Sequence, residues 1–143
     1  MTMADRITLY AYFVLIGAPL IIVISFVFIN WVSGSVNASV DDERLHVDAP
    51  LVDENISYGN IVSIEIRDDM EFGTRYNGFG GSKILSGGFK NSEFDKYTLA
   101  CYKNVKKFIV VEHTEGKILV FNQDSVEKTL LLYDELFEKW DNI

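Results

Sequence analysis

Cysteine and histidine are the side chains of this sequence that could supply a nucleophile, a base or a metal ligand. Cys101 is the only cysteine, and Cys101 with His113 is the only candidate pair of nucleophile and base. Such a pair needs an activated thiolate within hydrogen-bond reach of the imidazole. Cys101 shares a strand face with Leu99, and small buried cysteines are usually packing residues. We therefore predict no catalytic residue and no enzyme activity.

Metal and cofactor sites are not expected either. His46 and His113 are the only histidines, and they do not have zinc-finger or HExxH spacing. The carboxylate clusters 41–43, 53–54 and 68–69 lie in apparent turns without an EF-hand pattern, and turn carboxylates are usually solvated. We predict no metal and no cofactor.

A glycine-rich segment, Phe72 to Phe89, and several basic side chains are the candidate contacts for a ligand or partner. Glycine lets backbone N–H groups approach an anion, but no GxxxxGK[ST] motif is present. We therefore expect bulges and tight turns there, not a phosphate loop. The predicted contact residues are Arg75, Asn77, Lys83, Lys90, Lys103, Lys106 and Lys107.

Short strands separated by turn signals must position these residues. The expected strands are 35–40, 44–47, 51–56, 61–67, 96–102, 106–112 and 117–122. In the strand from Ile61 to Arg67, alternation puts Val62, Ile64 and Ile66 on one face. The last three strands, joined by short turns, predict an antiparallel meander.

A terminal helix follows the strands. Asp124 is the expected N-cap, with Glu127 at the third helical position as in a capping box. Apolar residues recur at three- and four-residue spacing, which predicts one stripe that packs against the sheet: Val126, Leu130, Tyr133, Phe137 and Trp140.

The N-terminal part of the chain has the character of a membrane segment. No charged residue occurs between Ile7 and Val40. As a helix, Ile7 to Ile29 would be about 34 Å long, enough to cross a hydrocarbon core of about 30 Å. Trp31 is the expected interfacial anchor, and Pro19 is expected to bend the helix. We predict a single span, in a segment 1–32, followed by one domain, 33–143.

Two alternatives concern this segment. Arg6 and the amino terminus precede the span, and nothing basic follows it until Arg44, which favours an extracytoplasmic domain. A cleaved signal peptide is the rival interpretation, because Val36, Asn37 and Ala38 fit a small-residue cleavage site and would leave a mature protein beginning at Ser39. The apolar run exceeds the usual length of about 7 to 15 residues of the apolar region within a signal peptide, which favours an uncleaved anchor.

The charge of the chain restricts its partners. Asp5 and Arg6 cancel, so the whole formal charge of −8 falls on residues 31 to 143. A negative field of this kind repels polyanions, so we predict no nucleic-acid partner.

The segment Phe72-Gly73-Thr74-Arg75-Tyr76-Asn77-Gly78-Phe79-Gly80, with Ser86-Gly87-Gly88-Phe89-Lys90 and the later runs 108–111, 120–122 and 129–133, resembles a family of bacterial pleckstrin-homology-like (PH-like) domains. The resemblance implies a mainly β fold, an antiparallel barrel of about seven strands capped by a C-terminal amphipathic helix. It implies no reaction, and so no catalytic residue. Members often follow transmembrane helices, commonly more than one.

The sequence therefore predicts a membrane-anchored, non-catalytic module. It would bind a protein, or itself, through a sheet edge or the face opposite the helix. The alternative is a domain that binds lipid headgroups or a small ligand with the basic residues and the glycine-rich segment.

Overall fold

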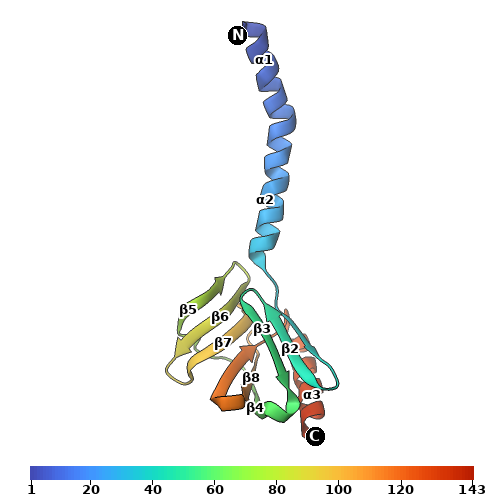
Figure 1. Cartoon of the computed structure of the whole chain (residues 1–143), viewed down its shortest axis with the longest axis vertical. Helices are drawn as coiled ribbons and strands as arrows, with labels where there is room; N and C mark the ends of the chain where they lie inside the picture. The colour runs from blue at the N-terminus through green and yellow to red at the C-terminus, as the bar shows by residue number, and fades with distance from the viewer. The chain divides into compact units, whose positions relative to one another are not determined.

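The computed structural model describes the backbone of residues 1–143 and the side chains of residues 1–29 and 34–143. The chain divides into two compact units, Met1–Ser33 and Gly34–Ile143, which are drawn in Figure 1. The expected anchor Trp31 falls outside the described side chains.

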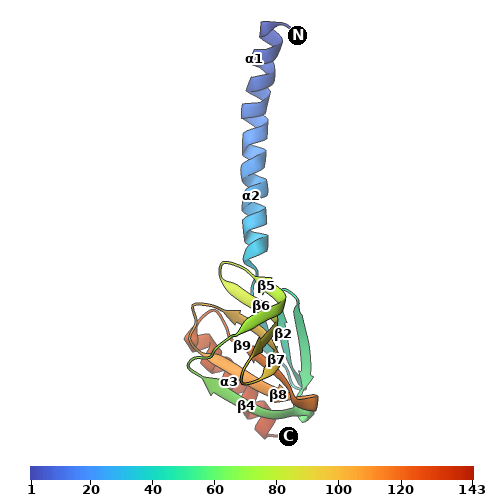
Figure 2. The ribbon, with the colours of Figure 1, turned by 90° about the vertical axis from the view of Figure 1, so that its left-hand side faces the viewer.

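The first unit is one helical run, α1 (Met3–Tyr12), η1 (Phe13–Gly17) and α2 (Ala18–Ser33), with η1 a π-helical turn (Figure 2). Pro19 has no N–H to offer the carbonyl of Leu15, and Leu15 lies inside the π-helical turn. The helix from Met3 to Ile29 is long and apolar enough to cross a bilayer, and none of its residues is buried.

The second unit contains two sheets and a helix. The three-stranded sheet has the order β1-β2-β3, and the six-stranded sheet has the order β4-β8-β9-β7-β6-β5. The bounds are β1 Asn37–Val40, β2 Arg44–Ala49, β3 Val52–Ser57, β4 Ile61–Arg67, β5 Thr74–Gly80, β6 Ile84–Asn91, β7 Asp95–Tyr102, β8 Phe108–His113, β9 Lys117–Phe121 and α3 Val126–Asp141.

This arrangement corrects two of the predictions. Among the described residues the nine strands form two separate sheets, so they do not close into one barrel of about seven strands. The last three strands do not form a meander, because β9 lies between β7 and β8 and pairs with β7 in parallel.

The loop between β7 and β8 crosses the strand position that β9 occupies, and Asn122 holds this loop in place. Its Oδ1 accepts from the Tyr102 amide at 2.7 Å, and its Nδ2 donates to the carbonyls of Tyr102 (3.2 Å) and Val105 (3.1 Å). This fully buried side chain, just after β9, therefore satisfies the backbone of the loop that crosses over β9.

The six-stranded sheet buries both of its faces. One face packs against the three-stranded sheet and α3, through residues that include Ile84, Val111 and Phe121. The other face, with Leu99 and Phe108 at its centre, is covered by Met70, Phe72 and Phe94. The face opposite the helix, predicted as a binding surface, is thus largely occupied by the chain itself.

A β-bulge corrects the predicted facing of β4. The register shifts between Ile61 and Ser63, so Val62 is the extra residue and is 61% exposed. The bulge places Ile61 and Ile64 on the buried side together.

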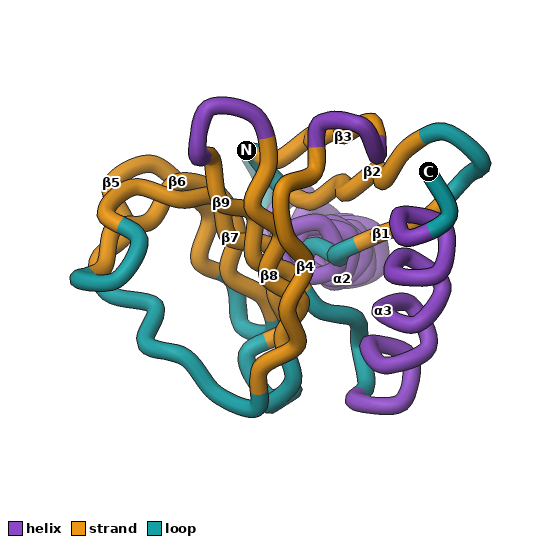
Figure 3. Tube along the Cα trace, turned by 90° about the horizontal axis from the view of Figure 1, so that it is seen from below, coloured by secondary structure: helices purple, strands orange, loops and turns teal.

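Helix α3 begins one residue later than predicted. Ser125 is the N-cap and accepts a hydrogen bond from the Lys128 amide at 3.2 Å, so Lys128, not Glu127, holds the third helical position. The helix lies beside β1 and β4 (Figure 3). Its buried residues are Thr129, Leu132 and Leu136. Of the predicted stripe, Tyr133 and Trp140 pack against this core, whereas Val126, Leu130 and Phe137 are exposed.

The glycine-rich segment contains the bulge that the sequence predicts, between Arg75 and Asn77, but it also forms two strands that were not expected, β5 and β6, paired as a hairpin. Gly87 has φ +114°, and a Cβ there would collide with the backbone of Asn77 and Gly78. This close approach, not an anion, explains the glycine.

Candidate functional site

The structure separates the predicted basic residues into different surroundings. Lys106 lies 3.8 Å from Asp69, and Lys107 forms an ion pair with Asp68. Lys90 lies 3.3 Å from Asp95 across the β6–β7 turn. These three lysines are therefore engaged by carboxylates of their own domain.

Lys83 and Lys103, in contrast, come together. The Lys103 amide donates to the Lys83 carbonyl at 2.9 Å, and Lys103 Nζ donates to the Gly81 carbonyl at 2.8 Å. Both line a groove of about 590 Å³, which we call the Lys83–Lys103 groove; its other walls are Gly34, Ser82, Tyr102, Asn104 and Asp124. Asp124 is paired with Lys128 at 2.9 Å, so the groove is locally positive on an acidic domain.

Arg75 and Asn77 lie in β5, away from this groove. The Arg75 guanidinium lies directly over Gly80, where an added Cβ would collide with it. Asn77 forms part of the bulge that contacts Gly87. Both residues are exposed, and the contacts described here lie within the hairpin.

Cys101 and His113 cannot act as a pair. Cys101 on β7 is fully buried among residues such as Leu99, and burial raises the pKa of its thiol to about 12. His113 ends β8, level with Lys117 of β9. The ladders place these two side chains at opposite ends of the sheet, about five residues or roughly 16 Å apart along the strands.

The Asp41 carboxylate holds the backbone of its own turn. Asp41 accepts from the amides of Glu43 (2.7 Å) and Arg44 (2.8 Å), and these bonds lower the pKa of its carboxyl. Within the described part of the chain, no group of three or more His, Cys, Asp or Glu side chains converges.

Helix α3 carries a surface whose exposure the sequence did not reveal. Val126, Leu130 and Phe137 are 38–43% exposed, and Tyr133 and Trp140 are partly buried. The rings of Tyr133 and Phe137 lie 5.9 Å apart, and those of Phe137 and Trp140 lie 5.8 Å apart. We call these five residues the α3 stripe. Their regular spacing predicts a buried face, whereas the fully buried residues of the helix lie about a quarter turn away.

An acidic row borders the α3 stripe. At 3.6 residues per turn, these side chains lie about a quarter turn from it, on the side away from the core. They are Glu127, Asp134, Glu138 and Asp141, all exposed.

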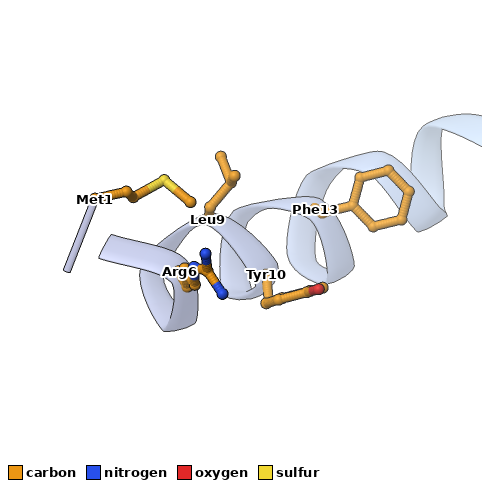
Figure 4. A pocket seen from close by; sticks show the side chains of 5 residues that line it. All are labelled: Met1, Arg6, Leu9, Tyr10 and Phe13. Atoms are coloured by element: carbon orange, nitrogen blue, oxygen red, sulfur yellow. The ribbon is translucent and has the colours of Figure 1, made fainter. Parts of the chain in front are cut away.

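A hollow also lies along α1, lined by Met1, Arg6, Leu9, Tyr10 and Phe13 (Figure 4). All of these residues come from one exposed helical segment and the residues before it, so the hollow is an open flank of a helix and not an enclosed site.

Comparison with known proteins gives one match. A family model described as "Bacterial PH domain" matches residues 36–129, more than half of the chain. No curated protein and no solved structure matches.

Proposed function

Because the chain belongs to the bacterial PH domain family, we propose that it is a membrane-anchored, non-catalytic module whose domain binds a protein partner through α3. A PH-like domain suggests a binding or interaction module. The apolar helix Met3–Ile29 would be the anchor.

The α3 stripe is the observation that carries this proposal. Half-exposed apolar side chains in a continuous row commonly mark interaction sites on soluble domains. The row has the spacing of a helix-in-groove or helix-pairing interface. The partner would therefore be an amphipathic helix that buries its apolar face on the stripe.

The acidic row defines the charge of that partner. Lysine or arginine side chains beside the apolar face of the partner helix would pair with Asp134 and its neighbours. A second copy of α3 would bring carboxylates against carboxylates, which opposes self-association through this surface.

The test uses the full chain in phosphatidylcholine nanodiscs and a synthetic helical peptide with a leucine face and lysine flanks. We expect saturable binding that Leu130→Ser and Phe137→Ser weaken, and that salt weakens through the acidic row. Leu131→Ser is the matched control, because Leu131 is 63% exposed but lies on another side of the helix. Empty nanodiscs measure binding of the peptide to lipid.

Two results would contradict the proposal. One is equal binding by the wild type and Phe137→Ser. The other is a photo-crosslinker at position 130 that joins two copies of this chain in preference to the peptide, which would identify the surface as a self-association interface.

Lipid-headgroup binding is the second candidate function, and the Lys83–Lys103 groove favours it. Gly34 lines this groove and is joined by one peptide bond to the last residue of α2. If α2 ends at the membrane surface, the two lysines would lie within reach of lipid phosphates, each contributing about 1 kcal/mol. Acetylation of Lys83 and Lys103 should then slow in nanodiscs that contain phosphatidylglycerol, while Lys96 stays equally reactive; unchanged rates would reject this function.

We further propose that the domain is extracytoplasmic, because Arg6 precedes the helix and no basic residue follows it before Arg44. Protease added to intact cells should cut the domain. Cleavage only after lysis would place the domain in the cytoplasm.

A further inference from the structure

A small polar pocket lies between the two sheets, at the end where β7 begins and β8 ends. Its volume is about 210 Å³. We call it the His113 pocket; the side chains that matter here are Glu54, Tyr76, Lys96, Thr98, His113 and Lys117. None of them belongs to the α3 stripe or to the Lys83–Lys103 groove.

The strand register brings three nitrogen-bearing side chains to one level. His113 is opposite Lys117 in the β8–β9 ladder. Thr98 is level with Leu119 in the parallel β7–β9 ladder, so Lys96, two residues earlier, is level with Lys117. Neighbouring strands are about 4.8 Å apart, so these side chains form a short row on the face that looks toward the other sheet.

This row is poorly neutralised. Lys96 has no carboxylate partner among the described residues, and its Nζ lies 5.5 Å from the centroid of the Tyr76 ring. The nearest carboxylate to Lys117 is that of Glu115, at 4.0 Å. His113 is only 9% exposed, yet no hydrogen bond joins its ring to any described residue. Like charges on neighbouring strands repel each other. The chain has a net charge of −8, so carboxylates that could have neutralised these lysines are in excess.

The pocket wall is shaped by a glycine. A Cβ on Gly88 would lie 2.5 Å from Cζ of Tyr76, so the absence of a side chain lets the ring lie over β6 and reach toward β7. The Tyr76 and Thr98 hydroxyl groups add two more donors beside the lysines.

We propose that the His113 pocket binds a small, soluble phosphate monoester. Lys96, Lys117, His113 and Thr98 donate to the phosphate oxygens, and Glu54, from β3, accepts from a hydroxyl group elsewhere in the ligand. The volume suits a ligand of a few carbon atoms. Lys96 and Tyr102 are six positions apart along β7, or about 20 Å, so this pocket is separate from the Lys83–Lys103 groove.

Binding and protonation of His113 are linked in this site. Burial lowers the pKa of His113 below its ordinary value; Glu54 opposes this by favouring the imidazolium, and Lys117 adds to it. Lys96 and the phenols of Tyr76 and Tyr97 are the other ionisable groups around the pocket. A dianion beside the ring favours the protonated form, so affinity should rise as pH falls from 8 to 6.

The test follows the ring signals of His113 and His46 by NMR, in the full chain in phosphatidylcholine nanodiscs, with glycerol phosphate as the probe. We expect a saturable shift of the His113 signal and none of the His46 signal, since His46 contacts Asn55 on another part of the surface. Lys96→Gln with Lys117→Gln should weaken binding at least about tenfold. Lys90→Gln, outside the pocket, is the matched control and should change little.

Glu54→Gln separates loss of binding from loss of fold. The glutamine Oε1 still accepts from the ligand hydroxyl group, while the negative charge that repels the phosphate is removed, so phosphate binding should strengthen severalfold. No saturable shift of the His113 signal up to about 10 mM probe would overturn the proposal. So would an equal shift with chloride at the same ionic strength. A shift that appears only in nanodiscs containing phosphatidic acid would overturn the soluble ligand.

Discussion

Asn122 is the side chain on which the strand order depends. It fixes both ends of the loop between Tyr102 and Val105 with three hydrogen bonds, in a site without solvent. No local pattern in the sequence distinguishes this asparagine from one in an ordinary turn. The hairpin signals around 103–107 therefore predicted the wrong neighbours for β7.

Asn122→Ala should be strongly destabilising. The substitution leaves an amide and two carbonyls without partners in the core, which should cost about 2–4 kcal/mol of the free energy of unfolding. In the Asn122→Ala variant, hydrogen exchange measured on the full chain in detergent should be faster at the Tyr102 amide, which loses its acceptor, than at the Ile109 amide. Asn142→Ala, at the exposed end of α3, is the control, and equal effects of the two substitutions would exclude the role given to Asn122.

His113 makes the stability of the domain depend on pH. Burial lowers the pKa of His113 from 6.5, so the unfolded chain binds a proton more readily than the folded chain. The contribution of His113 to stability is therefore complete above pH 6.5 and decreases as the pH falls toward the lower, folded-state pKa. Denaturation of the full chain in phosphate-free buffer at several pH values measures this slope.

His113→Gln should reduce the loss of stability below pH 6.5. An identical pH profile in wild type and His113→Gln would assign the slope to other groups.

At the scale of elements, the β5–β6 hairpin depends on a glycine contact. Gly87 combines a positive φ with a backbone approach that leaves no room for Cβ. Gly87→Ala should therefore destabilise the domain by about 2–4 kcal/mol, from backbone strain together with displacement of β5. Gly59→Ala is the matched control, because nothing lies within 4 Å of its added Cβ. Equal melting temperatures of the two variants would contradict this account.

Most of the elements were predictable, except for β5 and β6 in the glycine-rich segment, and the neighbours of the strands were not. Ile61 to Arg67 has the bounds expected from alternation, and the terminal helix follows the strands as expected. The alternation could not reveal the bulge at Val62, which depends on pairing with β8. Likewise, the sequence could not distinguish Ser125 from Asp124 as the N-cap, because both residue types are good N-caps. The hydrogen bond that Thr129 Oγ1 donates to the Ser125 carbonyl at 2.8 Å forms only in the folded turn.

The candidate surfaces were predictable only in part. The resemblance indicated the family, and the sequence indicated the basic residues. Which of these residues form ion pairs depends on the fold. Asp68 and Asp69 reach Lys107 and Lys106 from a loop far away in the sequence, so both lysines already have carboxylate partners within the domain. The His113 pocket unites residues from β3, β5, β7, β8 and β9, and no spacing along the chain indicates it.

At the scale of the whole molecule, the junction after the apolar helix is part of the folded domain. Val36 is 3% exposed in the core, and its amide donates to Tyr102 Oη at 3.3 Å. Asn37 and Ala38 pair with Asp48 and Val47 as the first half of β1. Cleavage before Ser39 would remove a core side chain and half of an edge strand that α3 contacts.

The chain should therefore remain joined to its apolar helix. Intact mass spectrometry of the membrane fraction should give a protein that retains residues 7–29, and carbonate washing should not release it. Ile22→Lys, near the middle of the helix, should weaken insertion, because a charge there costs about 2.5–3.5 kcal/mol on the insertion scale, whereas Thr8→Lys near its end should change little. A mature protein that begins at Ser39 would show instead that the segment is a signal peptide, and that the domain folds without Val36 and with a shortened β1.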